Sequence, residues 1–96
     1  MKEIENELTE LIDKLKKNFP HTLKAVILYG SWAKGKAGDH SDIDVLVLFS
    51  NLDDENKRKI HEIYSKIHTS HHLDLVYAKL EDFEQEKIPL YTAIKK

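Results

Sequence analysis

An apolar run that ends in Gly-Ser, followed by a second apolar run that begins with alternating aspartates, places the strongest constraint on how this chain can fold. The run Leu23–Tyr29 is apolar enough to be a buried strand, and Gly30 after it permits a sharp turn. Ser31 then begins a short helical segment, whose first N–H groups and hydroxyl favour phosphate oxygens. Residues 42–49 form the predicted second strand, so two strands flank a turn suited to a phosphate-bearing ligand.

Asp42 and Asp44 lie at the start of this second strand, and the two-residue period of a strand puts both carboxylates on one face. Neighbouring like charges repel and aspartate is a poor strand former, so the pair calls for a compensating cation. Magnesium suits the pair, because Mg²⁺ is commonly held by one or two carboxylates together with substrate phosphates. A third acid, Asp74, stands near the start of the apolar run Leu73–Ala78 and is the natural partner of the first two.

The predicted connections bring these residues together at one rim of the sheet. Gly30 and Ser31 follow the end of the first strand and Asp42 and Asp44 open the second, so they meet if these strands run antiparallel. A long helix separates the second strand from the third, and such a crossover makes those two strands parallel. Asp74 then lies at the same rim as the other two acids. The sequence therefore predicts one site built from all five residues.

The combination of these motifs is more specific than either alone. With ten residues between Ser31 and Asp42, and with Asp74 as a third acid, the chain resembles the minimal nucleotidyltransferases of the DNA polymerase beta-like superfamily. The resemblance covers residues 20–80 or so and implies the nucleotidyltransferase fold. Lys34 is a further candidate for binding the nucleotide phosphates. It departs from the family, which often has arginine there, because lysine keeps the charge without the bidentate geometry.

The resemblance implies transfer of a nucleoside monophosphate from a triphosphate to a hydroxyl, with pyrophosphate leaving. In that family two Mg²⁺ ions hold the attacking and departing oxygens. Carried over to this chain, Asp42 and Asp44 would be ligands of both metals. Asp74 would be a ligand of the catalytic metal and accept the proton of the incoming hydroxyl, while Gly30 and Ser31 would hold the terminal phosphates.

The resemblance also suggests a partner. Stand-alone proteins of this kind are often the antitoxin half of a two-protein module whose toxin is a HEPN ribonuclease, and some transfer AMP from ATP onto a tyrosine of that toxin. This favours a Mg²⁺-dependent, ATP-using nucleotidyltransferase whose acceptor is a partner protein. Two alternatives stay open: an antitoxin that neutralises its partner by binding alone, and a transferase that modifies a small molecule such as an antibiotic. The sequence names neither the nucleotide nor the acceptor.

The remaining patterns predict an α/β chain of the α+β kind, a small three-stranded mixed sheet with helices packed on it, within a single nucleotidyltransferase domain over residues 1–96. Apolar residues at helical spacing predict an amphipathic helix over 2–18 that ends before Pro20. Capping residues at 51–54 begin a crossover helix between the second and third strands.

The end of the chain carries two further expectations. Residues 80–87 form a short predicted helix that stops near Pro89. The segment 88–94 is unusually apolar, so it either closes the core, which is the favoured interpretation, or docks on a partner.

Composition excludes several other classes. Fifteen basic and seventeen acidic side chains give a formal net charge of −2, which argues against an extended nucleic-acid surface. The chain has no cysteine for disulfides and no apolar stretch near the ~20 residues of a membrane span. These features predict a cytoplasmic protein that does not bind membranes and that contacts nucleic acid, if at all, through a local patch.

Overall fold

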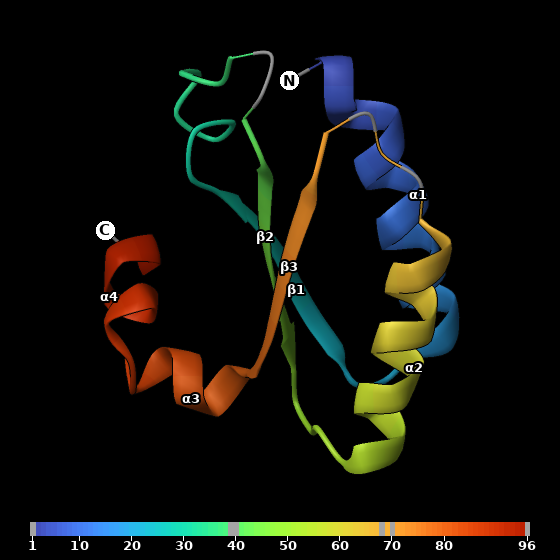
Figure 1. Ribbon diagram of the computed structural model, residues 1–96. Helices are drawn as coiled ribbons and strands as arrows, with labels where there is room; N and C mark the ends of the chain where they lie inside the picture. The colour runs from blue at the N-terminus through green and yellow to red at the C-terminus, as the bar shows by residue number, and fades with distance from the viewer. Residues whose placement is uncertain (1, 39–40, 68, 70, 96) are drawn as a thin grey trace.

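The computed structural model describes residues 2–38, 41–67, 69 and 71–95. The chain forms four helices and three strands in the described residues, and the sheet stands between two layers of helices (Figure 1). The elements are α1 (Lys2–Asn18), β1 (Leu23–Tyr29), β2 (Ile43–Phe49), α2 (Asp54–Lys66), β3 (Leu73–Lys79), α3 (Leu80–Glu84) and α4 (Pro89–Lys95). No helix among these described residues is long and apolar enough to cross a membrane.

The sheet has the predicted mixed topology. Its three strands lie in the order β1-β2-β3, with β1 antiparallel and β3 parallel to β2. The central strand β2 is apolar at every position but Asp44, and six of its seven residues are buried, because helices cover both faces of the sheet. The antiparallel and parallel pairings bring the end of β1 and the starts of β2 and β3 to the same rim.

Two apolar cores hold the helices on the sheet. On one face, α1 and α2 pack against alternate residues of β2 such as Val45 and Val47, and the rings of Phe19 and Phe49 meet edge to face at 5.0 Å. On the other face, Leu46 and Leu48 pack with residues of α3 and α4. Figure 1 shows that α3 and α4 leave more of the sheet uncovered than the longer helices do on the opposite face.

Helix boundaries follow the predicted signals. Helix α1 ends at Asn18, two residues before Pro20. Helix α2 begins after Asp53, whose carboxylate accepts a 2.7 Å hydrogen bond from the backbone N–H of Asn56. This side-chain cap satisfies one of the N–H groups that a helix start leaves without an intrahelical partner.

The short helix predicted after Ser31 is wrong, since residues 31–35 form a single turn. The N–H of Lys36 donates to the carbonyl of Ser31 at 2.9 Å and the N–H of Gly35 to that of Trp32 at 3.4 Å. Together with the positive φ of Gly35, 70°, these bonds form the helix-ending motif that caps one turn and stops it.

The end of the chain also differs from the prediction. The helix expected over 80–87 is shorter, Leu80–Glu84, and Pro89 begins a second helix, α4, where its missing N–H is harmless. Glu86, with φ of 50°, lies between the two helices. Tyr91 of α4 is buried in the second core with Leu90 and Ile94 packed against it, so this part of the apolar segment 88–94 closes the core as favoured, whereas Ile88 is exposed.

Candidate functional site

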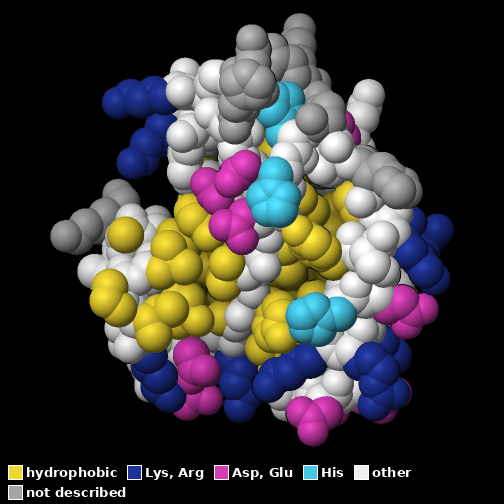
Figure 2. Space-filling view, in the orientation of Figure 1, with side chains coloured by type: hydrophobic (Ala, Val, Ile, Leu, Met, Phe, Trp, Pro, Cys, Tyr) yellow, Lys and Arg dark blue, Asp and Glu magenta, His cyan; other side chains and the backbone are white. Residues whose placement is uncertain are grey.

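The residues predicted to form one site lie in a row across the rim of the sheet. In the strand register Tyr29 is the partner of Asp44, and Asp44 is the partner of Asp74. Asp42 precedes β2 by one residue and Asp74 is the second residue of β3. Leu46 and Leu48 belong to the second core, on the face of the sheet that α3 and α4 cover. Because side chains alternate along a strand, Asp44 lies on that same face, nearer the start of β2 than these core residues. Figure 2 shows an acidic patch at this end of the sheet, next to an apolar surface.

The Gly-Ser turn approaches Asp44 very closely. Gly30 has φ of 76°, which L side chains rarely adopt, and a Cβ added to it would lie 2.3 Å from Oδ2 of Asp44. Only glycine therefore lets the backbone turn directly against this carboxylate. The turn and this carboxylate therefore lie against each other, as the predicted antiparallel pairing of the first two strands requires.

The turn also presents backbone donors. Its recorded hydrogen bonds use the N–H groups of Lys34, Gly35 and Lys36, and within the described part of the chain the N–H groups of Ser31 and Trp32 have no backbone partner. Ser31 itself is exposed. Successive free N–H groups at the start of such a turn are suited to an anionic oxygen.

Lys34 stands apart from this arrangement. Its backbone belongs to the turn, because its N–H donates to the carbonyl of Gly30 at 3.2 Å, but its side chain is exposed. The structure places Lys34 at the site's margin and shows no contact of its amino group with the acids. A role in binding phosphates therefore stays a prediction.

Trp32, to which the sequence pattern assigned no role, ties the rim together. It is buried, with 4% of its surface exposed, and its Nε1–H donates to the carbonyl of Ser41 at 3.3 Å, next to Asp42. Its ring meets that of His71 edge to face at 4.9 Å, just before β3. Trp32 thus links the turn after β1 to the segments that lead into β2 and β3. A lone tryptophan directly after the Gly-Ser turn was the only sequence signal for this link.

We expect Trp32→Phe to raise the Kd of Mg-ATP severalfold and to lower the free energy of unfolding by about 1–2 kcal/mol, since it removes the Nε1–H donor and leaves a small cavity. Urea unfolding and calorimetric titration would measure the two effects. Phe19→Leu, at the far end of the same core, is the matched control: it should lower stability without altering nucleotide affinity. Equal nucleotide affinity in both variants would mean that Trp32 only fills the core.

The three aspartates at the rim, Asp42, Asp44 and Asp74, lie close enough for their negative charges to affect one another. Burial raises the pKa of Asp44, and the nearby charges of Asp74 and Asp42 raise it further. The pKa of the Tyr29 hydroxyl is also raised, first by burial and then by Asp44 and Asp74. Sequence reasoning missed this tyrosine, which is the register partner of Asp44. An ionised row of acids is unfavourable on its own and is relieved by a proton or a cation.

Asp44→Asn should therefore stabilise the protein without metal, raising Tm at neutral pH by roughly 3 °C. The pKa of Asp44 is higher in the folded protein than in the unfolded chain. The wild-type protein therefore loses stability as the pH rises from the ordinary pKa of aspartate through the raised pKa of Asp44. The advantage of the variant should fade as the pH falls below the raised pKa of Asp44, because the wild-type carboxyl is then protonated. Thermal melts in chelator across this range would measure it. If Asp44→Asn melts at a lower temperature than the wild type at neutral pH, charge repulsion among the three aspartates does not destabilise the protein. Asp13→Asn, at an exposed position, is the control.

The donor set fits Mg²⁺ that arrives with a nucleotide. Among the described residues, no group of three or more His, Cys, Asp or Glu side chains is placed to hold a metal ion by itself. Mg²⁺ does not require such a cage, since it commonly keeps waters and takes one or two carboxylates together with substrate phosphates. Asp44 and Asp74, paired in register, with Asp42 beside them, supply hard oxygen ligands of that kind.

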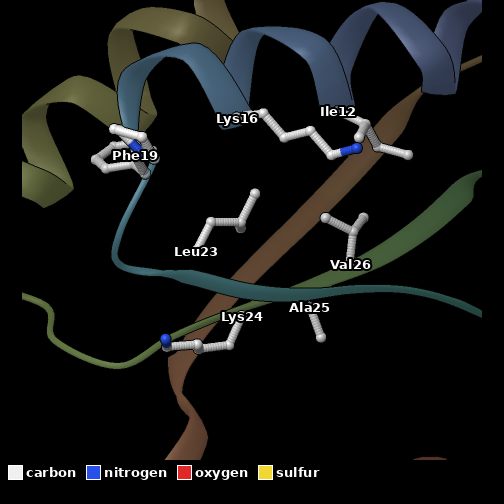
Figure 3. Close-up of a pocket in the computed structure, with 8 residues that line it drawn as sticks. Ile12, Lys16, Phe19, Leu23, Lys24, Ala25 and Val26 are labelled. Atoms are coloured by element: carbon white, nitrogen blue, oxygen red, sulfur yellow. The ribbon is translucent and has the colours of Figure 1, made fainter.

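A groove lined mostly by apolar side chains lies away from the acids. It has a volume of about 530 Å³ between α1 and β1. In Figure 3, Leu23 and Val26 point from β1 towards α1, where Ile12 and Lys16 lie. None of its lining residues is an acid or belongs to the Gly-Ser turn, so this groove is separate from the predicted site.

Comparisons with known proteins point to one family. The model of the family described as "Nucleotidyltransferase domain" matches residues 8–96. Two proteins of Methanocaldococcus jannaschii, both named provisionally as protein adenylyltransferases, are 43% identical over 51 residues and 38% identical over 65 residues. These matches cover 53% and 62% of this chain, and 35% and 66% of the relatives. The chain thus spans about a third of the first relative and about two thirds of the second.

Relatives that act on antibiotics also match. An aminoglycoside (3'') (9) adenylyltransferase of Shigella flexneri is 39% identical over 57 residues, which cover 59% of this chain and 22% of that protein. The fold is similar to that of spectinomycin adenyltransferase from Enterococcus faecialis, solved with ATP and spectinomycin, with a TM-score of 0.62 and 23% identity over 88% of this chain and 36% of that one. At this identity the likeness concerns the fold alone.

Proposed function

We propose that this chain, which belongs to the nucleotidyltransferase domain family, transfers AMP from ATP to a hydroxyl of a partner protein. One observation carries the proposal: Asp44 and Asp74 are register partners at the rim where the Gly30 turn approaches Asp44. A turn suited to phosphate oxygens lying beside paired carboxylates supports transfer from a nucleoside triphosphate.

In the proposed reaction the acceptor oxygen forms a bond to the α-phosphorus of ATP. The bond from that phosphorus to the oxygen bridging the α- and β-phosphates breaks, and pyrophosphate leaves with the electron pair. Asp74 accepts the hydroxyl proton, and the N–H groups at the start of the Ser31 turn hold the terminal phosphates. Asp42, Asp44 and Asp74 would hold Mg²⁺, which when bound neutralises the charge on the reacting oxygens.

The names of the Methanocaldococcus relatives support a protein as acceptor. The family resemblance supports a HEPN-type toxin as that protein, with this chain as its cytoplasmic antitoxin. A binding-only antitoxin would share the same partner without using the acids. The aminoglycoside adenylyltransferase relative favours a second candidate, transfer of AMP to the hydroxyl of a small antibiotic.

The test is to incubate the purified protein with Mg²⁺, each labelled nucleoside triphosphate and the protein encoded next to it, and to read the mass of that partner. We expect a gain of one nucleoside monophosphate from ATP, abolished by Asp42→Asn. A stable complex that silences the partner without any mass gain would contradict transfer and favour binding alone. Labelling of spectinomycin or an aminoglycoside in place of the partner would favour the small-molecule candidate.

A further inference from the structure

We propose that the free edge of β3 binds the acceptor as an added, extended strand, so that the acceptor is a polypeptide segment; this inference rests on the proposed function. An in-line displacement puts the attacking and leaving oxygens on opposite sides of the phosphorus. The Gly30 turn follows β1, Asp44 is on β2 and Asp74 is on β3, and the strands lie in the order β1-β2-β3. With the leaving pyrophosphate at the β1 side, the acceptor must enter from the β3 side.

The β3 side of the sheet has an open backbone edge. In the described sheet β3 pairs with β2 alone. The N–H of Ile43 in β2 donates to the carbonyl of His72, just before β3. Every second residue of β3 therefore directs its backbone N–H and C=O groups towards β2. The residues between them, Leu75 and Tyr77 included, direct these groups away from the sheet. Figure 2, which looks onto this edge, shows its white backbone uncovered between apolar side chains on both sides. Such an edge is a template for another strand.

Near the start of β3 one outward carbonyl of this edge has a side-chain partner, and a small pocket lies beside it. The hydroxyl of Tyr64, from α2, donates to the carbonyl of Leu73, the first outward carbonyl of β3. The pocket next to it has a volume of about 200 Å³ and is lined by Ile60, His61, Tyr64, Asp74, Leu75 and Tyr77. Sites for drug-sized molecules usually occupy about 300–1,000 Å³, so this pocket suits a single side chain better than a whole antibiotic.

The alternation of a strand connects the pocket with the acids. A peptide residue paired beside Asp74 directs its side chain to the acidic face, where its hydroxyl can meet the carboxylate. The next residue points to the opposite face, towards the pocket between β3 and α2. There His61 and Tyr77 stand edge to face at 5.8 Å and contact each other through Nε2 and the hydroxyl at 3.4 Å. The acceptor motif is therefore a hydroxyl residue followed or preceded by an apolar or aromatic one.

The test uses a library of short extended peptides with a central Ser, Thr or Tyr, wild-type protein, Mg²⁺ and ATP labelled on the α-phosphate. We expect labelling to be at least about tenfold greater when the neighbouring residue is apolar than when it is Asp, and to fall by at least about tenfold when the backbone nitrogens that pair with β3 are methylated. His61→Trp, which fills the pocket, should remove the preference for an apolar neighbour, whereas Lys59→Trp, on another side of α2, should keep it.

Pyrophosphate release distinguishes the two ways of failing. If labelling is insensitive to backbone methylation and to His61→Trp, the proposal of an added strand is wrong, while the proposed transferase activity still stands. The proposal of an added strand is also wrong if small hydroxyl compounds are labelled and peptides are not, with pyrophosphate release that depends on Asp42. Absence of Asp42-dependent pyrophosphate release with every acceptor would overturn the proposed function and this inference with it.

Discussion

Asp74→Asn is expected to lower kcat for AMP transfer by about 10³-fold while the Kd of Mg-ATP stays within about threefold. Asp74 lies on β3, the strand farthest from the Gly30 turn, and we propose that it receives the proton of the attacking hydroxyl. Asparagine keeps the size of the side chain but accepts no proton and carries no charge. Initial rates with labelled ATP give kcat, and calorimetric titration gives the Kd of Mg-ATP.

The comparison with Asp44→Asn sharpens this prediction. Asp44 touches the turn that we assign to the triphosphate, so its replacement should weaken Mg-ATP binding as well as the rate. Asp13→Asn, an exposed acid of α1, should change neither. If Asp74→Asn lost Mg-ATP affinity and rate together, Asp74 would belong with the nucleotide side of the site and not with the acceptor side.

The strands and their pairing could be predicted from the sequence because their signals are local. The run Leu23–Tyr29 is the observed β1, and the other two strands differ from their predicted spans by one residue at one end. β2 starts at Ile43 instead of Asp42, and β3 continues to Lys79. The long helix between β2 and β3 then determined the parallel pairing, which brought Asp44 and Asp74 into register.

The parts that could not be predicted depend on contacts between distant residues. A single capped turn and a short helix begin with the same residues, and only the conformation of Gly35 separates them. Trp32 acts through the carbonyl of Ser41 and the ring of His71, neither of which is a sequence neighbour. Tyr29 looked like the last apolar residue of a strand, and its place beside Asp44 appeared only with the register.

Gly30→Ala is expected to reduce AMP transfer by about 10²-fold or more, and to lower the free energy of unfolding by about 1–2 kcal/mol. The stability loss comes from forcing a residue with a Cβ to φ of 76°. The activity loss has a second cause, because the new Cβ would lie 2.3 Å from Oδ2 of Asp44 and that carboxylate must turn away. Urea unfolding and transfer rates measured on the same preparation give both quantities.

Gly35 provides the matched control, since it has nearly the same backbone conformation, φ of 70°, but nothing within 4 Å of an added Cβ. Gly35→Ala should lose a similar amount of stability and keep most of its activity. The contrast isolates the position of the Asp44 carboxylate from general strain in the turn. If both variants lost activity equally, the strained turn itself would be what the reaction needs. If neither lost activity, the Asp44 carboxylate could move without harm, and its close contact with the Gly30 turn would have no part in transfer.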